Sequence, residues 1–263
     1  MDQQKLIDAI TEQVMQRLIQ AQAGSVSPGA QSVSATPKLQ PAELAKYIDH
    51  TLLKPDAPTS GFDKLCEEAI QYGMKSVCVN SSRVPYVARK LQGTKVQVCA
   101  VVGFPLGAMS SRSKAFEARD AISEGAAELD MVLAVGHLKS KEYDFVLEDI
   151  RSVRRATRSN TVLKVIIETS MLSEEEKVIA CELSKKAGAD FVKTSTGFGG
   201  GGATVEDISL MRSVVGPEMG VKASGGVRDY DKALLMIGAG ADRIGAATSV
   251  PIVTGVRGTG AGY

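Results

Sequence analysis

Two lysines at the ends of short apolar segments are the residues of this sequence best suited to covalent chemistry. Lys193 lies near the end of one segment and precedes a run of glycines at 199–202. Lys222 holds the same place in the next segment, before a serine and two glycines. An ammonium group in an apolar setting must be paired or lose its proton. If the segments are neighbouring strands, each ammonium disfavours the other, and a free amine can form a Schiff base. Two salt-bridged lysines are the alternative.

Charged residues on other apolar segments are expected to face the same interior. Asp130 interrupts an apolar strand, where an unpaired carboxylate would be costly and one beside a lysine is compensated. Because side chains alternate along a strand, placing Lys193 inward turns Thr194 towards the helices. A structural charge network at the strand ends is the alternative to an active site. The other side chains expected to point inward are Asp49, Cys78, Asn80, Lys164, Glu168 and Lys222.

Two glycine clusters near the lysines fit a phosphate group. Gly225 and Gly226 precede a helix expected to begin near Arg228, and the glycines at 199–202 precede a helix capped by Thr204. Exposed backbone N–H groups at such junctions bind anions. A flexible connector without a ligand is the alternative, since loops are rich in glycine for backbone reasons alone. The neighbouring lysines favour the phosphate site.

Strand and helix patterns alternate from Pro41 onward, which predicts an α/β fold of the (β/α)8 TIM-barrel type. Helix starts are predicted where a capping residue precedes a carboxylate by three positions, at Ser60, Ser173 and Thr204. A doubly wound sheet is the main competitor, but no G-x-G-x-x-G follows the first strand. Chemistry in such a barrel lies at the C-terminal strand ends. The predicted strands are 47–50, 76–80, 96–102, 128–133, 163–168, 191–195, 221–224 and 243–246.

Composition limits the classes of function. The chain has 263 residues, 44% of them hydrophobic, which suffices for one large domain with an appendage. A net charge of +1 provides no basic field for nucleic acid or an anionic membrane, and no apolar run reaches the roughly 18 residues of a membrane span. Four scattered cysteines predict a reduced, cytoplasmic protein. Two histidines exclude the usual His-rich zinc sites and argue against a Ser-His-Asp triad.

The N-terminal residues differ in pattern from the rest. Within residues 1–22, apolar side chains recur at every fourth position from Leu6 to Leu18, which predicts an amphipathic helix. Residues 23–41 have a linker composition, which leaves 42–263 as the barrel domain. The arrangement resembles the encapsulation peptides that attach enzymes to shell proteins of bacterial microcompartments. A self-association helix, a helix that packs on the barrel and a less favoured membrane-surface helix are alternatives.

Seven motifs occur in order between about Leu44 and Val253, at residues 48–55, 76–80, 102–107, 128–132, 164–169, 191–198 and 221–226. Together they resemble the deoxyribose-phosphate aldolases, a family of class I aldolases. The resemblance implies reversible cleavage of 2-deoxy-D-ribose 5-phosphate to acetaldehyde and D-glyceraldehyde 3-phosphate. It also implies that neither a metal nor an organic cofactor takes part.

The functional residues of that family match residues already singled out. Lys193 matches the Schiff-base lysine, Lys222 the second lysine that lowers its pKa, and Asp130 the carboxylate that shuttles protons through a water. Asp49 and Lys164 match supporting members of this network. The residues expected to bind the substrate are Cys78, Thr194, Gly197, Gly199, Gly225, Gly226 and Thr248.

Two positions near the C-terminus need separate comment. Many relatives carry adjacent serines after the last strand, where this chain has Ala247 and Thr248. Weaker phosphate binding or a broader substrate range is therefore the hypothesis. The last residue is Tyr263, and some family members use a C-terminal tyrosine on a mobile tail as a proton relay. An idle terminus is the alternative, because chain ends are usually mobile.

Other functions are compatible with the same residues. A Schiff-base aldolase for a different phosphorylated sugar would share the fold and the lysine. A catalytically idle barrel, held to a shell or another partner by residues 1–22, is the second alternative. Because barrels of this family commonly dimerise, we expect a homodimer, in the cytoplasm or inside a microcompartment.

Overall fold

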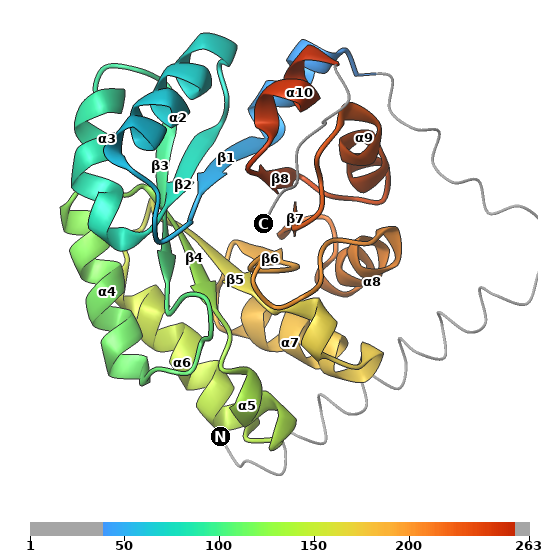
Figure 1. Cartoon of the computed structure of the whole chain (residues 1–263). Coiled ribbons are helices and arrows are strands. Elements are labelled where there is room, and N and C mark those ends of the chain that lie inside the picture. Colours follow the sequence, from blue (N-terminus) through green and yellow to red (C-terminus); the bar gives the residue numbers. More distant parts are fainter. Residues whose placement is uncertain (1–38, 256–263) are drawn as a thin grey trace, which may run out of the picture.

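In the computed structural model, which describes residues 39–255, eight parallel strands close into a barrel. Each strand pairs with the next, and β8 returns to β1 through the register Ile48↔Ile244 (Figure 1). The closure confirms the predicted TIM barrel and excludes the doubly wound sheet. The strands are β1 Ile48–Leu52, β2 Ser76–Val79, β3 Gln97–Val102, β4 Glu128–Val132, β5 Val162–Ile166, β6 Phe191–Lys193, β7 Gly220–Ser224 and β8 Arg243–Ala246.

Helices connect successive strands and surround the barrel (Figure 1). The α-helices are α2 Thr59–Tyr72, α3 Val84–Leu91, α4 Ser111–Ser123, α5 Val135–Lys139, α6 Tyr143–Ala156, α7 Glu174–Lys186, α8 Val205–Val215, α9 Tyr230–Gly238 and α10 Ser249–Thr254. Three short 3₁₀ helices complete the described chain: η1 Pro41–Tyr47, η2 Ser81–Arg83 and η3 Thr169–Met171.

Two of the three predicted helix starts are confirmed. Ser173 and Glu176 form a reciprocal capping box at α7, and the Thr204 hydroxyl accepts from the Asp207 N–H at α8. The prediction at Ser60 is wrong, because α2 begins one residue earlier with Pro58 as its N-cap. Proline there supplies a backbone carbonyl and a fixed φ, so the helix starts without a side-chain cap.

Two predicted strands end two residues sooner than their apolar patterns suggested. The segment 163–168 leaves the sheet after Ile166, and Glu168 adopts a left-handed φ of 56° where the chain turns into η3. The segment 191–195 leaves it after Lys193. Both strands end at the C-terminal mouth of the barrel, where the backbone leaves the sheet and forms the loops around the site.

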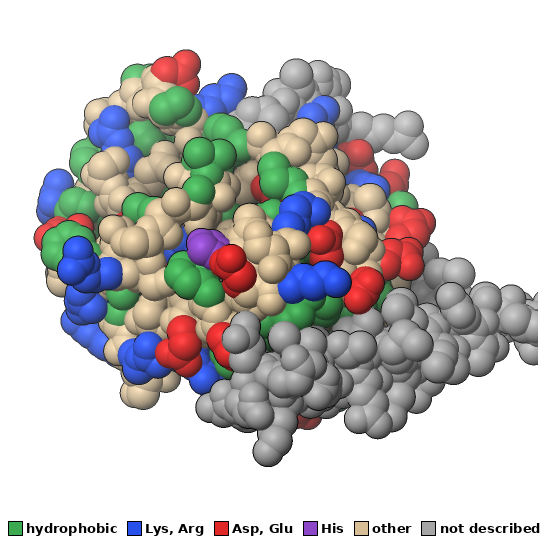
Figure 2. Space-filling view, turned by 90° about the horizontal axis from the view of Figure 1, so that it is seen from below, with side chains coloured by type: hydrophobic (Ala, Val, Ile, Leu, Met, Phe, Trp, Pro, Cys, Tyr) green, Lys and Arg blue, Asp and Glu red, His purple; other side chains and the backbone are tan. Residues whose placement is uncertain are grey.

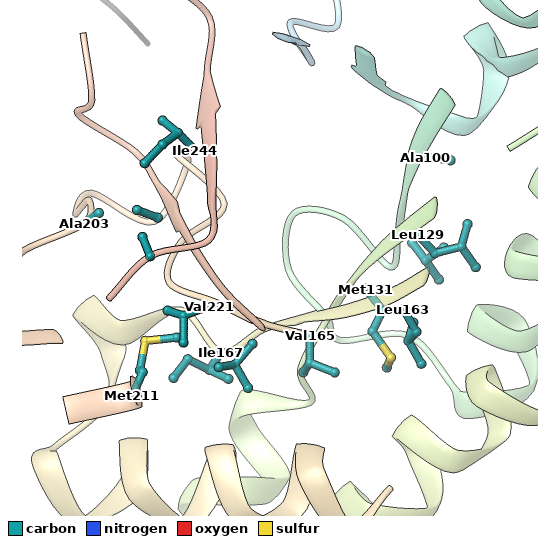
Figure 3. Close-up of a cluster of buried hydrophobic side chains, with 14 of the residues drawn as sticks. Ala100, Leu129, Met131, Leu163, Val165, Ile167, Ala203, Met211, Val221 and Ile244 are labelled. Atoms are coloured by element: carbon teal, nitrogen blue, oxygen red, sulfur yellow. The ribbon is translucent and has the colours of Figure 1, made fainter. Parts of the chain in front are cut away.

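The principal core lies between the barrel and its ring of helices. In Figure 3 the side chains of Met131, Leu163, Val165 and Val221 project from strands into this layer, and Met211 of α8 joins them. Because side chains alternate, these strands turn apolar residues outward and leave their other face to the barrel interior. That interior face carries the charged residues described below.

The first helix of the described residues packs against the last. The 3₁₀ helix η1 lies beside α10, and the Tyr230 hydroxyl of α9 donates to the Leu39 carbonyl. Residues 1–22, most of the predicted linker and Tyr263 lie outside the described residues, so the predictions made for them stay predictions.

The surface of residues 39–255 carries charges of both signs. On the face shown in Figure 2, acidic and basic side chains are interspersed, and such a mixture produces no strong field of one sign. Within the same residues, no helix has both the length and the apolar character that crossing a membrane requires.

Candidate active site

Lys193 on β6 and Lys222 on β7 are register partners on neighbouring strands. Both side chains donate to one carboxylate oxygen, Asp130 Oδ2, at 2.8 and 2.7 Å respectively. Lys193 is 3% exposed and the other two residues are fully buried. The predicted convergence of two amines is therefore confirmed, and it takes place around a shared carboxylate.

A third lysine holds the other oxygen of the same carboxylate. Lys164 on β5 donates to Asp130 Oδ1 at 3.0 Å and to Glu128 Oε2 at 2.6 Å. Strand alternation explains the geometry, because Glu128 and Asp130 lie two positions apart on β4 and face the same side. Asp130 thus receives hydrogen bonds from three ammonium groups.

Arg243 completes the charge network on the side nearer the N-terminal strand ends. Its Nε donates to Asp49 Oδ1 at 2.9 Å, and its Nη2 donates to Glu128 Oε2 at 2.8 Å. Asp49 also forms an ion pair with Lys222. Asp49 therefore links Arg243 to Lys222. This position agrees with the supporting place in the network that was predicted for Asp49.

Arg243 and Glu128 were not among the predicted site residues. Glu128 could have been found, because it shares a strand face with Asp130. Arg243 begins β8, and an arginine at the start of a strand has the pattern of a surface residue although it is only 5% exposed here. Only the pairing of β8 with β1, which brings it to Asp49, reveals its place.

Burial and ion pairing act in opposite directions on the two central acids. Burial by itself raises the pKa of Asp130, but the charges of Lys164, Lys193 and Lys222 outweigh it and hold that pKa well below its usual range. The pKa of Asp49 is likewise lowered, because Lys222 and Arg243 outweigh the effect of burial. Both carboxylates are thus ionised around neutral pH.

The pKa of Lys222 is not lowered, contrary to what the sequence suggested. Burial alone would lower the pKa of Lys222, but Asp130 and Asp49 outweigh it and raise that pKa. The expectation that each lysine lowers the pKa of the other is therefore wrong for Lys222, which remains a cation. The physical reason is that acids lie between the amines and compensate the charge of one of them.

Acid is expected to destabilise the fold through these carboxylates. Their pKa values are lowered in the folded state, so the stabilisation is present above the unfolded pKa of about 3.9 and is lost as pH falls through the folded values. We expect the unfolding free energy from urea titrations to fall steeply from about pH 4 to about pH 2. Asp49→Asn should show a shallower decline over that range. Equal slopes for the variant and the wild type would contradict this origin.

Two buried thiols lie beside Asp130. Cys99 Sγ donates to Asp130 Oδ1 at 3.1 Å, and Cys78 Sγ lies 4.0 Å from Oδ2. Burial raises the pKa of Cys99, whereas the interaction with Cys99 lowers the pKa of Cys78 despite its burial. The three ligand atoms lie within 4.8 Å of one another, but both Asp130 oxygens already serve ammonium groups. A divalent ion would have to displace those lysines.

An open pocket lies over this cluster at the C-terminal strand ends. Gly225 and Gly226 line it with φ values of 85° and 77°, a left-handed backbone region that favours glycine. Of the three lysines bonded to Asp130, only Lys193 is among its lining residues. The pocket is lined by Thr51, Leu53, Lys193, Thr196, Gly197, Ser224, Gly225, Gly226, Val227, Arg228, Gly245, Ala246, Ala247 and Thr248.

Three of the predicted substrate-binding residues do not line this pocket. Gly199 lies against Glu168, whose carboxylate carbon would be 2.7 Å from an added Cβ. Thr194 is fully buried, and its hydroxyl donates to the Ser224 carbonyl at 2.9 Å. It therefore faces away from the interior, as alternation predicted, and holds the end of β7. Cys78 lies below the pocket beside Asp130.

Two pocket residues were not predicted as ligands. Arg228 was treated only as the start of a helix, although it is the one cation besides Lys193 that lines the pocket within the described chain. Ser224 was treated as part of a glycine-rich turn, yet its buried hydroxyl has no hydrogen-bond partner among residues 39–255. Ser224 directly precedes Gly225 and Arg228 lies two positions after Gly226, which was the available signal.

Asn80 and Glu168, also expected to face inward, support the loops around the pocket. Asn80 Nδ2 donates to the Leu53 carbonyl at 3.1 Å. Glu168 Oε2 accepts from the Thr196 backbone N–H at 3.2 Å and from the Thr196 hydroxyl. Leu53 and Thr196 both line the pocket, so these two polar side chains fix its walls.

Comparison with known proteins places these features in a family. The model of the DeoC/LacD family aldolases matches residues 43–258, which include every strand of the barrel. The chain belongs to the DeoC/LacD family of aldolases. Membership confirms the enzyme class that the motifs suggested, and it accounts for a lysine-rich barrel mouth in an aldolase.

Deoxyribose-phosphate aldolases of other organisms align with this chain over nearly their whole length. The deoxyribose-phosphate aldolase of Brevibacillus brevis is 60% identical over 220 residues, which are 84% of this chain and 99% of that protein. That of Clostridium novyi is 57% identical over the same shares. The tetrameric deoxyribose phosphate aldolase structure from Aeropyrum pernix is 33% identical, has a TM-score of 0.79, and matches 86% of this chain and 97% of that chain.

Proposed function

We propose that this aldolase reversibly cleaves 2-deoxy-D-ribose 5-phosphate to acetaldehyde and D-glyceraldehyde 3-phosphate through a Schiff base on Lys193. The observation that carries the proposal is the position of Lys193, which lines the pocket while the two other lysines on Asp130 remain beneath it. The names of relatives that are 57% and 60% identical support the choice of substrate.

Covalent capture would make the carbon–carbon bond cleavable. The Lys193 amine adds to the C1 aldehyde of the open-chain sugar and loses water, which gives an iminium ion. The C3 hydroxyl then loses its proton while the C2–C3 electron pair moves towards the iminium nitrogen. D-glyceraldehyde 3-phosphate leaves, and an enamine stays on the enzyme. Protonation at C2 followed by hydrolysis releases acetaldehyde and restores the amine.

Asp130 and Lys222 are suited to proton movement in this sequence. Asp130 accepts hydrogen bonds from both lysine nitrogens at one oxygen, so a water near that oxygen can exchange protons with the substrate. Lys222 has a raised pKa and stays a cation, whose charge disfavours a second ammonium ion at Lys193. Asp49 and Lys164 hold these two residues in place through their own ion pairs.

The far end of the pocket is suited to the phosphate. Gly197, Gly225, Gly226 and Arg228 line this pocket, and backbone N–H groups and a guanidinium are groups that bind anions. Anchoring the phosphate would orient the reacting carbons over Lys193. Thr248 can add a hydroxyl, whereas Ala247 cannot.

Reductive trapping tests the proposal. The protein is incubated with acetaldehyde and sodium borohydride and then mapped by peptide mass spectrometry. We expect one adduct, on Lys193, together with turnover of 2-deoxy-D-ribose 5-phosphate. An adduct without turnover would favour a different phosphorylated sugar, and the absence of an adduct would favour an idle scaffold.

We also propose that residues 1–22 attach the enzyme to a shell protein of a microcompartment and that the barrel forms a homo-oligomer, in the first instance a dimer. The four-residue apolar spacing and the linker composition support the first part. Deleting residues 1–22 should leave turnover intact and abolish co-purification with shell particles. Loss of turnover would instead indicate that the segment packs on the barrel.

A further inference from the structure

His50 lies outside the reactive cluster and joins three elements of the barrel. It is on β1, and its side chain is on the strand face opposite to that of Asp49. Its Nε2 lies 2.8 Å from Glu68 Oε2 on α2, and its Nδ1 lies 3.0 Å from Ser249 Oγ on α10. His50 is 3% exposed and Ser249 is fully buried, whereas the Glu68 side chain is partly exposed.

The hydroxyl of Ser249 joins His50 to the end of β8. Its oxygen lies 2.9 Å from the Ala246 carbonyl oxygen and 3.0 Å from His50 Nδ1. Glu68 lies at the other ring nitrogen. Both nitrogens of His50 therefore have a hydrogen-bond partner, and the imidazole is held between α2 and α10.

The contacts from Glu68 through His50 and Ser249 to Ala246 hold the turn between Ala246 and Ser249. Ala246, Ala247 and Thr248 form the wall of the pocket beside Gly225 and Gly226. Thr248, the N-cap of α10, receives no side-chain cap bond of its own. The hydrogen bond between the Ser249 hydroxyl and the Ala246 carbonyl joins the two ends of this turn. His50 in turn contacts the same hydroxyl and fixes its position.

A second surface hollow shows how close His50 lies to this wall. His50, Lys64, Glu68, Ala247 and Thr248 are among its lining residues. Ala247 and Thr248 therefore line both hollows. A displacement of the turn towards His50 would enlarge the pocket at the end suited to the phosphate.

We propose that His50 and Ser249 are positioning residues, which hold the turn 246–248 in the shape that receives the substrate phosphate. This inference rests on the proposed function. Neither side chain touches the reacting atoms, so their loss should weaken substrate binding and leave the amine chemistry unaffected. The effect should appear only when the sugar carries its phosphate.

Kinetics with matched sugars test this role. For His50→Gln and Ser249→Ala, we expect KM for 2-deoxy-D-ribose 5-phosphate to rise about tenfold, which is the loss of roughly one hydrogen bond, with kcat changed less than about twofold. For unphosphorylated 2-deoxy-D-ribose, kcat/KM should stay within about twofold of the wild type. The double variant should match either single variant, because both changes break the same chain of bonds.

His137→Gln is the matched control, because it replaces the only other histidine, whose ring stacks on Phe145 away from this pocket. It should leave both sugars unaffected. A merely structural role of His50 would lower thermal stability and reduce turnover of both sugars alike, and that result would overturn the inference. Additive effects in the double variant would also overturn it. A wild type that fails to cleave the phosphorylated sugar would instead refute the proposed function and remove the basis of this inference.

Discussion

Lys193→Arg is expected to lower kcat for cleavage of 2-deoxy-D-ribose 5-phosphate by about 10⁴-fold or more. Arginine keeps a positive charge beside Asp130, but a guanidinium stays protonated and cannot form the imine. The loss would therefore report on covalent chemistry and not on charge. Release of D-glyceraldehyde 3-phosphate, coupled to an NADH-consuming enzyme, measures it, and borohydride trapping should yield no adduct.

Lys177→Arg is a suitable control for that experiment. Lys177 on α7 pairs with Asp207 on α8 at 2.6 Å and lies outside the pocket, so its replacement should change kcat by less than about twofold. Lys193→Met serves as a second test in case the guanidinium disturbs the cluster. If either Lys193 variant kept more than about a tenth of wild-type activity, a Schiff base at this residue would be excluded.

Much of the barrel could be predicted because its strands have a simple pattern. Buried parallel strands appear as short apolar runs, and charged residues within them stand out. Alternation then placed Asp130 and Lys164 on the inner face and turned Thr194 away, all of which the structure confirms. Register between β6 and β7 was the one assumption about neighbours, and it is correct for Lys193 and Lys222.

The electrostatic detail could not be predicted from alternation alone. The pKa of Lys222 is raised because two acids lie beside it, and the sequence does not say how closely an acid on a distant strand approaches. Asp130 lies across the barrel from β7, yet its Oδ2 is 2.7 Å from Lys222. Such contacts across the barrel depend on closure, curvature and side-chain length, and this also explains why Arg243 was missed.

The pocket lining was harder to predict than the reactive cluster. Glycine runs indicate permissive backbone, but each glycine can serve a different purpose. Gly226 lines the pocket, whereas Gly199 makes room for Glu168 and Gly202 allows close approach of the Gly225 backbone. These purposes differ through neighbours that are distant in sequence, and no local pattern separates them.

Lys222→Met separates an active site from a structural charge network. The replacement removes the cation that shares Asp130 Oδ2 with Lys193 and leaves Asp49 paired with Arg243. Without that cation, protonation of the Lys193 amine is less opposed, and the proton relay loses a member. We expect kcat/KM near neutral pH to fall by about 10²-fold or more, with the half-maximal rate of acetaldehyde adduct formation displaced to higher pH.

Lys164→Met is the matched comparison, because Lys164 is equally buried and bonds the other oxygen of Asp130. Removing a buried partner of a carboxylate costs about 3–5 kcal/mol, so both variants should unfold at lower urea concentration. Only Lys222→Met should displace the pH dependence strongly, because Lys222 is the register partner of Lys193 and bonds the same carboxylate oxygen. If both variants lost stability while the pH dependence of adduct formation stayed where it is in the wild type, the cluster would be a structural network and Lys222 would have no part in activating the amine.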